Sequence, residues 1–248
     1  MPGDAYDRLI GRYSRELAPR FIDFAGVDRG PVLDVGCWPG GLSLALASRL
    51  GGQAVTAVDP SESFVTACRA RVPGADVRLA RAEALPFAPA TFEALLAQLV
   101  LSFVSDAPRA MAEAIRVVRP GGTIAACTFA ADGLALVATV WRAALRYDPA
   151  VPDDARLPFR REEELLALFR NAGLRDVVLD RIDLEARYAD FDDFWEPFAF
   201  GIGPAGSYLV RQPQDRRAEI RDACREILGS PPGAFTLPAR VLAVRGRA

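Results

Sequence analysis

The sequence predicts an α/β fold built on a mostly parallel β-sheet. Short apolar runs that end in turns alternate with segments in which apolar residues recur at every third or fourth position. Strands that alternate with helices are joined by crossover connections, which produce a parallel sheet covered by helices on both faces. The 248 residues, half of them hydrophobic, are sufficient for one large domain with its own core.

Five strands are predicted in the first half of the chain, at residues 31–35, 54–58, 76–80, 92–97 and 123–129. The segments between them include helices at 42–50, 61–71 and 106–118, the last with an aspartate and an early proline at its start. Short amphipathic helices are predicted at 4–25, before the first strand. Residues 30–130 therefore form the expected core of a single domain that spans residues 1–248.

The pattern changes after residue 129. Helices are predicted at 134–147, 161–171 and 215–228, and strands at 177–184 and 240–245. Between the two late strands, at about residues 186–235, lies a stretch rich in aromatic residues, glycine and proline. We interpret this stretch as a small helical cap that packs over the mouth of the sheet.

The sequence contains neither histidine nor lysine, so all 30 of its basic residues are arginines. The absence of lysine excludes a P-loop and a pyridoxal Schiff base. The absence of histidine excludes a Ser-His-Asp triad and imidazole-ligated metal sites, and no metal site is predicted. Acid–base chemistry would fall to Asp, Glu, Tyr, Cys or water.

The charge and cysteine content further limit the partners and the compartment. A net charge of −2 gives no reason to expect nucleic acid as a partner. The four cysteines are scattered and form neither a CxxC pair nor a disulfide framework, which favours a reducing, cytoplasmic compartment. No run approaches the roughly 20 apolar residues of a membrane span, and the first residues lack an apolar signal core.

Two neighbouring strand ends carry residues suited to a nucleotide-like ligand. Residues 32–41 read Val-Leu-Asp-Val-Gly-Cys-Trp-Pro-Gly-Gly, a glycine-containing turn between a strand and a helix, where a ligand can approach backbone N–H groups. Asp59 ends the second strand, where a carboxylate meets ribose hydroxyls in such folds. Two interpretations of Asp59 stay open, ribose binding and capping of the next helix.

Three further segments appear in a characteristic order. Residues 81–87 read Arg-Ala-Glu-Ala-Leu-Pro-Phe, residues 91–98 read Thr-Phe-Glu-Ala-Leu-Leu-Ala-Gln, and residues 116–122 read Arg-Val-Val-Arg-Pro-Gly-Gly. Together with the glycine turn and Asp59, they resemble the class I S-adenosylmethionine-dependent methyltransferases, in particular the branch of quinone-ring C-methyltransferases and small-molecule methyltransferases. The resemblance covers about residues 5–245. It implies a Rossmann-like, doubly wound, seven-stranded sheet whose last strand, 240–245, runs antiparallel.

The resemblance also implies S-adenosylmethionine as the cofactor and assigns residues to its methionine half. Gly36, Cys37 and Gly40 would line that half of the pocket. Gln98, at the end of the fourth strand, would face the methionyl end.

The nucleoside half is assigned in the same way. Asp59 would bind both ribose hydroxyls and Pro60 would lie beside the adenine. Ala82 and Glu83 would lie on the other side of the adenine. The N-terminal helices would close over the cofactor through Tyr13 or Arg12.

Trp38 departs from the family pattern, because it stands where the family has the middle glycine of the loop. In one interpretation the indole packs aside and leaves room for the cofactor, which we expect. In the other the site binds the cofactor poorly or has changed its task. If the loop requires a positive φ at this position, the indole adds strain and the loop should be displaced from its usual course.

The aromatic residues of the cap have two interpretations, packing in a core and lining of an apolar acceptor pocket. They are Phe191, Phe194, Trp195, Phe198, Phe200 and Tyr208. The acidic residues beside them would form a solvated face or supply a base; they are Asp190, Asp192, Asp193 and Glu196.

The expected function is transfer of a methyl group from S-adenosylmethionine to an O, N or C atom of a small, partly apolar acceptor. The alternatives are a fold recruited to a non-methylating reaction, such as cyclisation in a natural-product biosynthetic pathway, and a degenerate, non-catalytic partner. The sequence identifies neither a catalytic base nor the acceptor, and it predicts no oligomeric state.

Overall fold

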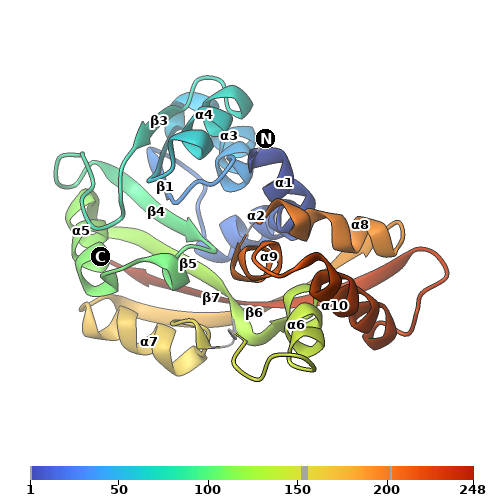
Figure 1. Ribbon diagram of the computed structural model, residues 1–248. Coiled ribbons are helices and arrows are strands. Elements are labelled where there is room, and N and C mark those ends of the chain that lie inside the picture. The colour runs from blue at the N-terminus through green and yellow to red at the C-terminus, as the bar shows by residue number, and fades with distance from the viewer. Residues whose placement is uncertain (1, 152–155, 202) are drawn as a thin grey trace. The chain divides into compact units, whose positions relative to one another are not determined.

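A computed structural model of the protein describes residues 2–151, 156–201 and 203–248, with side chains from residue 6 onward. Its described strands form one seven-stranded sheet with the order β3-β2-β1-β4-β5-β7-β6 (Figure 1). The chain divides into two compact units. The sheet unit comprises Ser14–Thr128, Pro158–Ile182 and Val241–Ala248, and the helical unit comprises Met1–Tyr13, Phe129–Leu157 and Asp183–Arg240.

The strands confirm the predicted α/β architecture. They are β1 (Val32–Val35), β2 (Val55–Asp59), β3 (Asp76–Leu79), β4 (Phe92–Gln98), β5 (Val118–Leu134), β6 (Arg175–Tyr188) and β7 (Phe235–Arg247). β1 pairs in parallel with β2 and with β4, β2 pairs in parallel with β3, and β4 with β5.

The last strand runs antiparallel to β5, as predicted. At one end of the pair, the Ala248 N–H donates to the Gly122 carbonyl at 3.0 Å. At the other end, Gly133 lies against the carbonyl of Arg240. Higher numbers in β5 therefore face lower numbers in β7, which only antiparallel strands produce. The antiparallel strand β7 thus makes the sheet a mixed one.

β5 is longer than the predicted segment 123–129. The sequence Arg-Pro-Gly-Gly at 119–122 is typical of a helix end, yet it lies within β5, directly after a helix that ends at Val117. The β4–β5 register shifts between Phe92 and Ala94, so the extra residues bulge out of the ladder. Gly121 adopts a φ of 81°, and its N–H donates to the carbonyl of Ala248.

The longer helices agree closely with the predicted segments. The α-helices of the described residues are α1 (Pro2–Leu9), α2 (Gly11–Ala25), α3 (Gly41–Leu50), α4 (Glu62–Arg71), α5 (Ala107–Val117), α6 (Ala135–Ala144), α7 (Glu162–Asn171), α8 (Phe191–Trp195), α9 (Gly203–Val210) and α10 (Gln214–Ile227). The short helices α8 and α9 had no segment of their own predicted. Short 3-10 helices occur at η1 (Gly52–Ala54), η2 (Leu101–Phe103) and η4 (Glu196–Phe200). Asp106 caps α5, where its carboxylate accepts a hydrogen bond from the Arg109 N–H.

Within the sheet unit, α4 packs on the second and third strands. Its Val65 and Cys68 form a buried cluster with Ala57 of β2 and Val77 of β3. Cys37, from the glycine turn, belongs to the same cluster. The position of the helix that follows Asp59 is therefore fixed by apolar contacts with the sheet.

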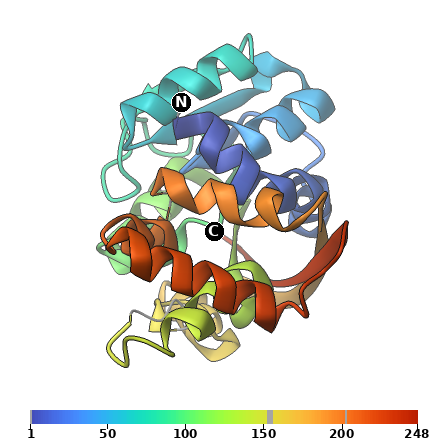
Figure 2. The ribbon, with the colours of Figure 1, turned by 45° about the vertical axis from the view of Figure 1, so that its right-hand side comes forward.

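Within the helical unit, aromatic rings form the core. The rings of Tyr188 and Phe235 stack at 5.3 Å, and Phe194 meets Tyr188 edge-on at 5.9 Å. Phe191 and Phe198 are buried with them, which favours the core interpretation of these residues. Figure 2 shows α8 and α10 side by side (orange and red). None of the described helices combines the length and apolar content that a membrane span needs.

Candidate functional site

The carboxyl ends of three parallel strands bring the main predicted site residues to one edge of the sheet. β1 lies between β2 and β4 and is parallel to both. Gly36 follows β1, Asp59 ends β2 and Gln98 ends β4. Open parallel sheets bind ligands in the crevice at this edge.

Gly36 is required at the turn after β1 for two separate reasons. Its φ is 73°, in the left-handed region that side chains with a Cβ rarely adopt. A Cβ at this position would lie 2.4 Å from a methyl group of Val100. The close approach to Val100 packs the turn against the segment that follows β4.

Hydrogen bonds tie the glycine loop to the end of β2. The N–H groups of Gly36 and Cys37 both donate to the carbonyl of Val58, at 2.8 and 3.0 Å. The Trp38 N–H donates to Asp59 Oδ2 at 3.1 Å. In this structure these three loop amides therefore donate to β2.

Trp38 adopts a φ of 50°, so the loop does require a positive φ at this position. Its indole packs edge-on against Phe64 of α4 at 5.3 Å and against Phe103 of η2 at 5.9 Å. A non-glycine residue in this region costs about 1–2 kcal/mol relative to the usual backbone conformations. Contacts with the two phenyl rings offset part of that cost.

Asp59 is buried, with 3% of its surface exposed, and burial raises the pKa of its carboxyl. Oδ1 accepts from the Ser61 N–H at 2.8 Å, while Oδ2 accepts from Trp38. Ser61, and not Asp59, occupies the N-cap position of α4. A carboxylate has about four lone-pair sites, so each oxygen keeps capacity for a further donor.

Gln98 contributes an unsatisfied acceptor. Its side-chain amide donates to Ser14 Oγ of α2 at 2.7 Å, and the residue is 4% exposed. Its Oε1 is buried and accepts no hydrogen bond from any described residue. A buried carbonyl oxygen left without a donor costs about 1–3 kcal/mol. A ligand with an N–H or ammonium group would satisfy it.

The predicted adenine-side residues form a less enclosed part of the site. Pro60 is exposed and Ala82 is half-buried. Glu83 accepts hydrogen bonds from the N–H and hydroxyl of Ser105, at 3.0 and 2.7 Å. Partial burial raises the pKa of Glu83, but the hydrogen bonds from Ser105 and Asp106 outweigh it, so the pKa is lowered. Glu83 thus holds its loop to the start of α5.

The remaining residues of the loop have structural surroundings. The Cys37 side chain lies in the apolar cluster with Cys68, so only its backbone could face a cofactor. Gly40 has a φ of 92°, and a Cβ there would lie 3.0 Å from Cys68 Sγ. Its N–H donates to the carbonyl of Cys37. Their roles in cofactor binding stay predictions.

Asp34, in β1, is a buried carboxyl group behind the loop. Burial raises its pKa to about 7, although the Ser43 hydroxyl donates to Oδ2 at 2.5 Å and favours the charged form. The charge of Asp59 raises the pKa further. Oδ1 accepts no hydrogen bond from the described residues. Below about pH 7, the folded protein therefore holds Asp34 mainly in its protonated form.

This raised pKa predicts a loss of stability with increasing pH. The unfolded chain loses the Asp34 proton near pH 4, whereas the folded chain holds it to about pH 7, so the stabilisation is complete below pH 4 and is lost by pH 7. We expect Asp34→Asn to remove about 1.6 kcal/mol of the fall in unfolding free energy between pH 5.5 and 7. Urea unfolding of both proteins at the two pH values checks this. Parallel pH curves would contradict it.

Tyr13 and Arg12, predicted to close over the cofactor, are both held in the helical unit. The Tyr13 ring is fully buried, and its hydroxyl lies 3.2 Å from that of Tyr188. Burial raises the pKa of Tyr13 to about 12, so the phenol stays protonated. Arg12 donates to both carboxylate oxygens of Asp193, at 2.9 and 3.1 Å. Their closing role stays a prediction.

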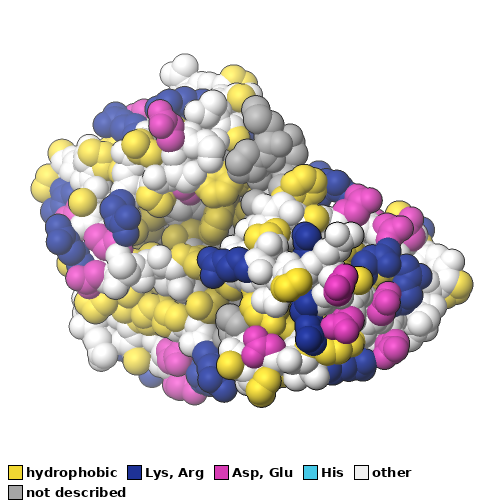
Figure 3. Space-filling model, viewed as in Figure 1, with side chains coloured by type: hydrophobic (Ala, Val, Ile, Leu, Met, Phe, Trp, Pro, Cys, Tyr) yellow, Lys and Arg dark blue, Asp and Glu magenta, His cyan; other side chains and the backbone are white. Residues whose placement is uncertain are grey.

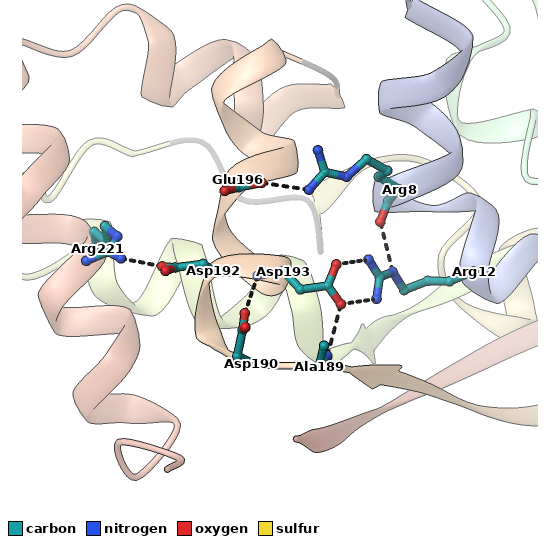
Figure 4. A network of polar contacts seen from close by, with 8 residues as sticks. All are labelled: Arg8, Arg12, Ala189, Asp190, Asp192, Asp193, Glu196 and Arg221. Atoms are coloured by element: carbon teal, nitrogen blue, oxygen red, sulfur yellow. Dashed lines mark hydrogen bonds and ion pairs between the residues drawn. The ribbon is translucent and has the colours of Figure 1, made fainter. Parts of the chain in front are cut away.

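The acidic residues in and next to α8 form a structural network (Figure 4). Asp190 caps α8, Asp192 pairs with Arg221, and Glu196 pairs with Arg8. Hydrogen bonds from Arg12 lower the pKa of Asp193 despite its partial burial. These groups hold segments of the helical unit together, and a carboxylate with a lowered pKa is a poor base.

Sequence reasoning did not include Ser14, Phe64 or Phe103 in the site. Ser14 bonds Gln98 from 84 residues away, and the two rings reach Trp38 from separate segments. One signal for Ser14 was present in the sequence. Its hydroxyl lies on the face of α2 that otherwise carries apolar residues toward the core, and a buried hydroxyl needs a hydrogen-bond partner.

Comparison with known proteins identifies the family. Residues 33–126 match the model of a methyltransferase domain. A malonyl-[acyl-carrier protein] O-methyltransferase of Geobacter sulfurreducens is 31% identical over 187 residues, 73% of this chain and 69% of the relative. The corresponding enzyme of Enterobacter lignolyticus is 37% identical over 112 residues, so the chain spans 44% of its length.

The solved structures agree. A putative type II methyltransferase from Anaeromyxobacter dehalogenans is 26% identical, with a TM-score of 0.65 and coverage of 94% of this chain and 95% of the other. The [4+2]-cyclase SpnF, at 21% identity, has a TM-score of 0.58, with coverage of 94% of this chain and 82% of that one, and shares the fold. The fold, the order of the motifs and these relatives agree, and the chain belongs to the class I S-adenosylmethionine-dependent methyltransferase family.

Proposed function

We propose that this chain transfers a methyl group from S-adenosylmethionine to an O, N or C atom of a small, partly apolar acceptor. The observation that carries the proposal is the pair of buried polar groups at the ends of β2 and β4. Asp59 keeps acceptor capacity and Gln98 Oε1 has no donor among the described residues. A ribose diol and a methionine ammonium group supply hydrogen-bond donors that match these two acceptors.

The two acceptors therefore match the hydrogen-bond donors of the cofactor. Asp59 would hold the ribose hydroxyls, and Gln98, oriented by Ser14, would accept from the ammonium group. When bound, the cofactor supplies an electrophilic methyl group on a sulfonium. The chain's own contribution is orientation and exclusion of water, since in-line positioning alone supplies about 7–11 kcal/mol in well-oriented reactions. The acidic network of the helical unit is engaged in ion pairs, which supports a mechanism that relies on positioning.

Calorimetry tests the binding step. Protein stripped of ligand is titrated with S-adenosylmethionine and S-adenosylhomocysteine, and then incubated with methyl-labelled cofactor and a panel of phenols, amines and acyl carboxylates that includes a malonyl thioester. Binding of both cofactor forms with label transfer to a panel member supports the proposal. If neither S-adenosylmethionine nor S-adenosylhomocysteine binds, the proposal is overturned.

A second candidate function has one observation in its favour. Trp38 occupies a backbone conformation that favours glycine, and its indole packs against Phe64 and Phe103 beside the loop. A side chain at this position, where the family has glycine, is compatible with a site that carries out a non-methylating reaction. The [4+2]-cyclase SpnF shares the fold. Cofactor binding without methyl transfer to any acceptor would favour this candidate.

Trp38→Gly separates the two candidates. If the indole leaves room for the cofactor, we expect the affinity for S-adenosylhomocysteine to change less than tenfold, which is under about 1.4 kcal/mol. Trp38→Ala is the matched control, because it removes the indole but keeps the strain of a Cβ at a φ of 50°. A much larger gain in affinity in both variants, or methyl transfer only in the variants, would show that Trp38 blocks the site.

A further inference from the structure

The helical unit contains a cavity that the proposed methyl transfer does not use. Its volume is about 470 Å³, within the range of about 300–1,000 Å³ that is typical of small-molecule sites. One wall is apolar and comes from η4, α8 and α9; it consists of Trp195, Phe198, Ala199, Leu209 and Val210. The other wall comes from α10.

The α10 wall is one face of the helix. Gln214, Arg217, Ala218 and Arg221 line the cavity, and their spacing of three and four residues places them on the same side. Ile220, Ala223 and Cys224 of the same helix are buried. Figure 3 shows basic and acidic side chains mixed over the area of α8 to α10. The cavity thus has an apolar wall facing a polar one that carries two arginines.

The two arginines differ in their partners. Arg221 pairs with Asp192 at 2.5 Å, and its guanidinium lies over the Phe191 ring at 5.2 Å. Its charge is therefore balanced and its position is fixed. The Nε of Arg217 is buried and has no hydrogen-bond acceptor among the described residues. A buried donor without an acceptor costs about 1–3 kcal/mol, or more for a charged group.

We propose that this cavity binds an amphipathic monocarboxylate, such as an alkanoate. The carboxylate accepts a charge-assisted hydrogen bond from the guanidinium of Arg217, which lines the cavity. The alkyl body lies on Phe198 and Leu209. The ligand should carry a single negative charge. Among the described residues that line the cavity, the other arginine is Arg221, and its charge is already balanced by Asp192.

Calorimetry with octanoate on the full chain, with no S-adenosylmethionine present, tests this site. We expect octanoate to bind, and 1-octanol and acetate to bind at least tenfold more weakly, because each lacks one half of the recognition. Arg217→Gln should weaken octanoate binding at least tenfold. Arg216→Gln is the matched control, since Arg216 pairs with Glu219 and lies over the Tyr147 ring, away from the cavity lining.

A second variant keeps the arginine and fills the space. Ala218→Phe places a ring in the cavity from an exposed position on α10, so it should abolish octanoate binding while circular dichroism shows a folded protein. Equal binding of 1-octanol and octanoate, unchanged affinity in Arg217→Gln, unchanged affinity in Ala218→Phe, or no binding of octanoate to the unaltered chain would each overturn the proposal.

Discussion

Asp59→Ala is expected to weaken the binding of S-adenosylhomocysteine at least tenfold. Asp59 is the carboxylate at the end of β2, and its two oxygens have acceptor capacity beyond the amides of Trp38 and Ser61. Hydrogen bonds to a charged group contribute about 1.5–3 kcal/mol each, and 1.4 kcal/mol corresponds to a tenfold change in affinity. Calorimetric titration of the wild-type chain and the variant measures the difference.

Asp76→Ala is the control for this experiment. Asp76 begins the neighbouring strand β3, is exposed and pairs only with the nearby Arg78 in the described part of the chain, so its loss should leave the affinity within about twofold. The thermal stability of each variant without ligand distinguishes weaker binding from unfolding. Unchanged affinity in Asp59→Ala would leave this carboxylate with only its role in holding the loop amides.

Gly36→Ala should lower the free energy of unfolding by about 2–5 kcal/mol. The new Cβ would lie 2.4 Å from a Val100 methyl group, and its φ of 73° adds strain. Overpacking costs about 1–3 kcal/mol, and the left-handed conformation costs about 1–2 kcal/mol more. Urea unfolding measures the loss.

Gly229→Ala separates the two causes. Gly229 follows α10 with a φ of 74°, close to that of Gly36, and no atom lies within 4 Å of the place a Cβ would take, so only the conformational cost of about 1–2 kcal/mol should appear. Val100→Ala combined with Gly36→Ala should recover part of the loss, because it removes the methyl groups that clash. Equal losses for Gly36→Ala and Gly229→Ala would show that the contact with Val100 is easily relaxed.

The fold was predictable because its signals are local. Apolar runs located all seven strands, and the caps and stop residues located the longer helices. The extension of β5 through residues 119–122 was not predictable, since its pairing partner is Ala248, at the other end of the sequence. Helix α9 was also missed, because it contains glycine and proline; Gly206 is needed there for close contact with the backbone of Gly201.

The positions of Asp59 and Gln98 at strand ends were predictable, because motifs fix these residues there, while their roles toward a cofactor stay predictions. Partners that come from distant segments were not. Nothing beside Gln98 in the sequence indicates the hydroxyl of Ser14, and nothing beside Trp38 indicates Phe64 or Phe103. The sequence raised the question of positive φ at Trp38, but only the folded loop answers it, because the hydrogen bond to Asp59 holds the backbone in that conformation.

The attachment of the glycine loop to β2 has a consequence for ligand binding. A ligand hydroxyl that donates to Asp59 Oδ2 shares this oxygen with the Trp38 N–H, and so acts on the loop that would line the other half of the cofactor. The two halves of the pocket then share one carboxylate oxygen and are energetically coupled. Such coupling is reciprocal, so a change at residue 38 alters nucleoside affinity as much as a nucleoside alters the loop.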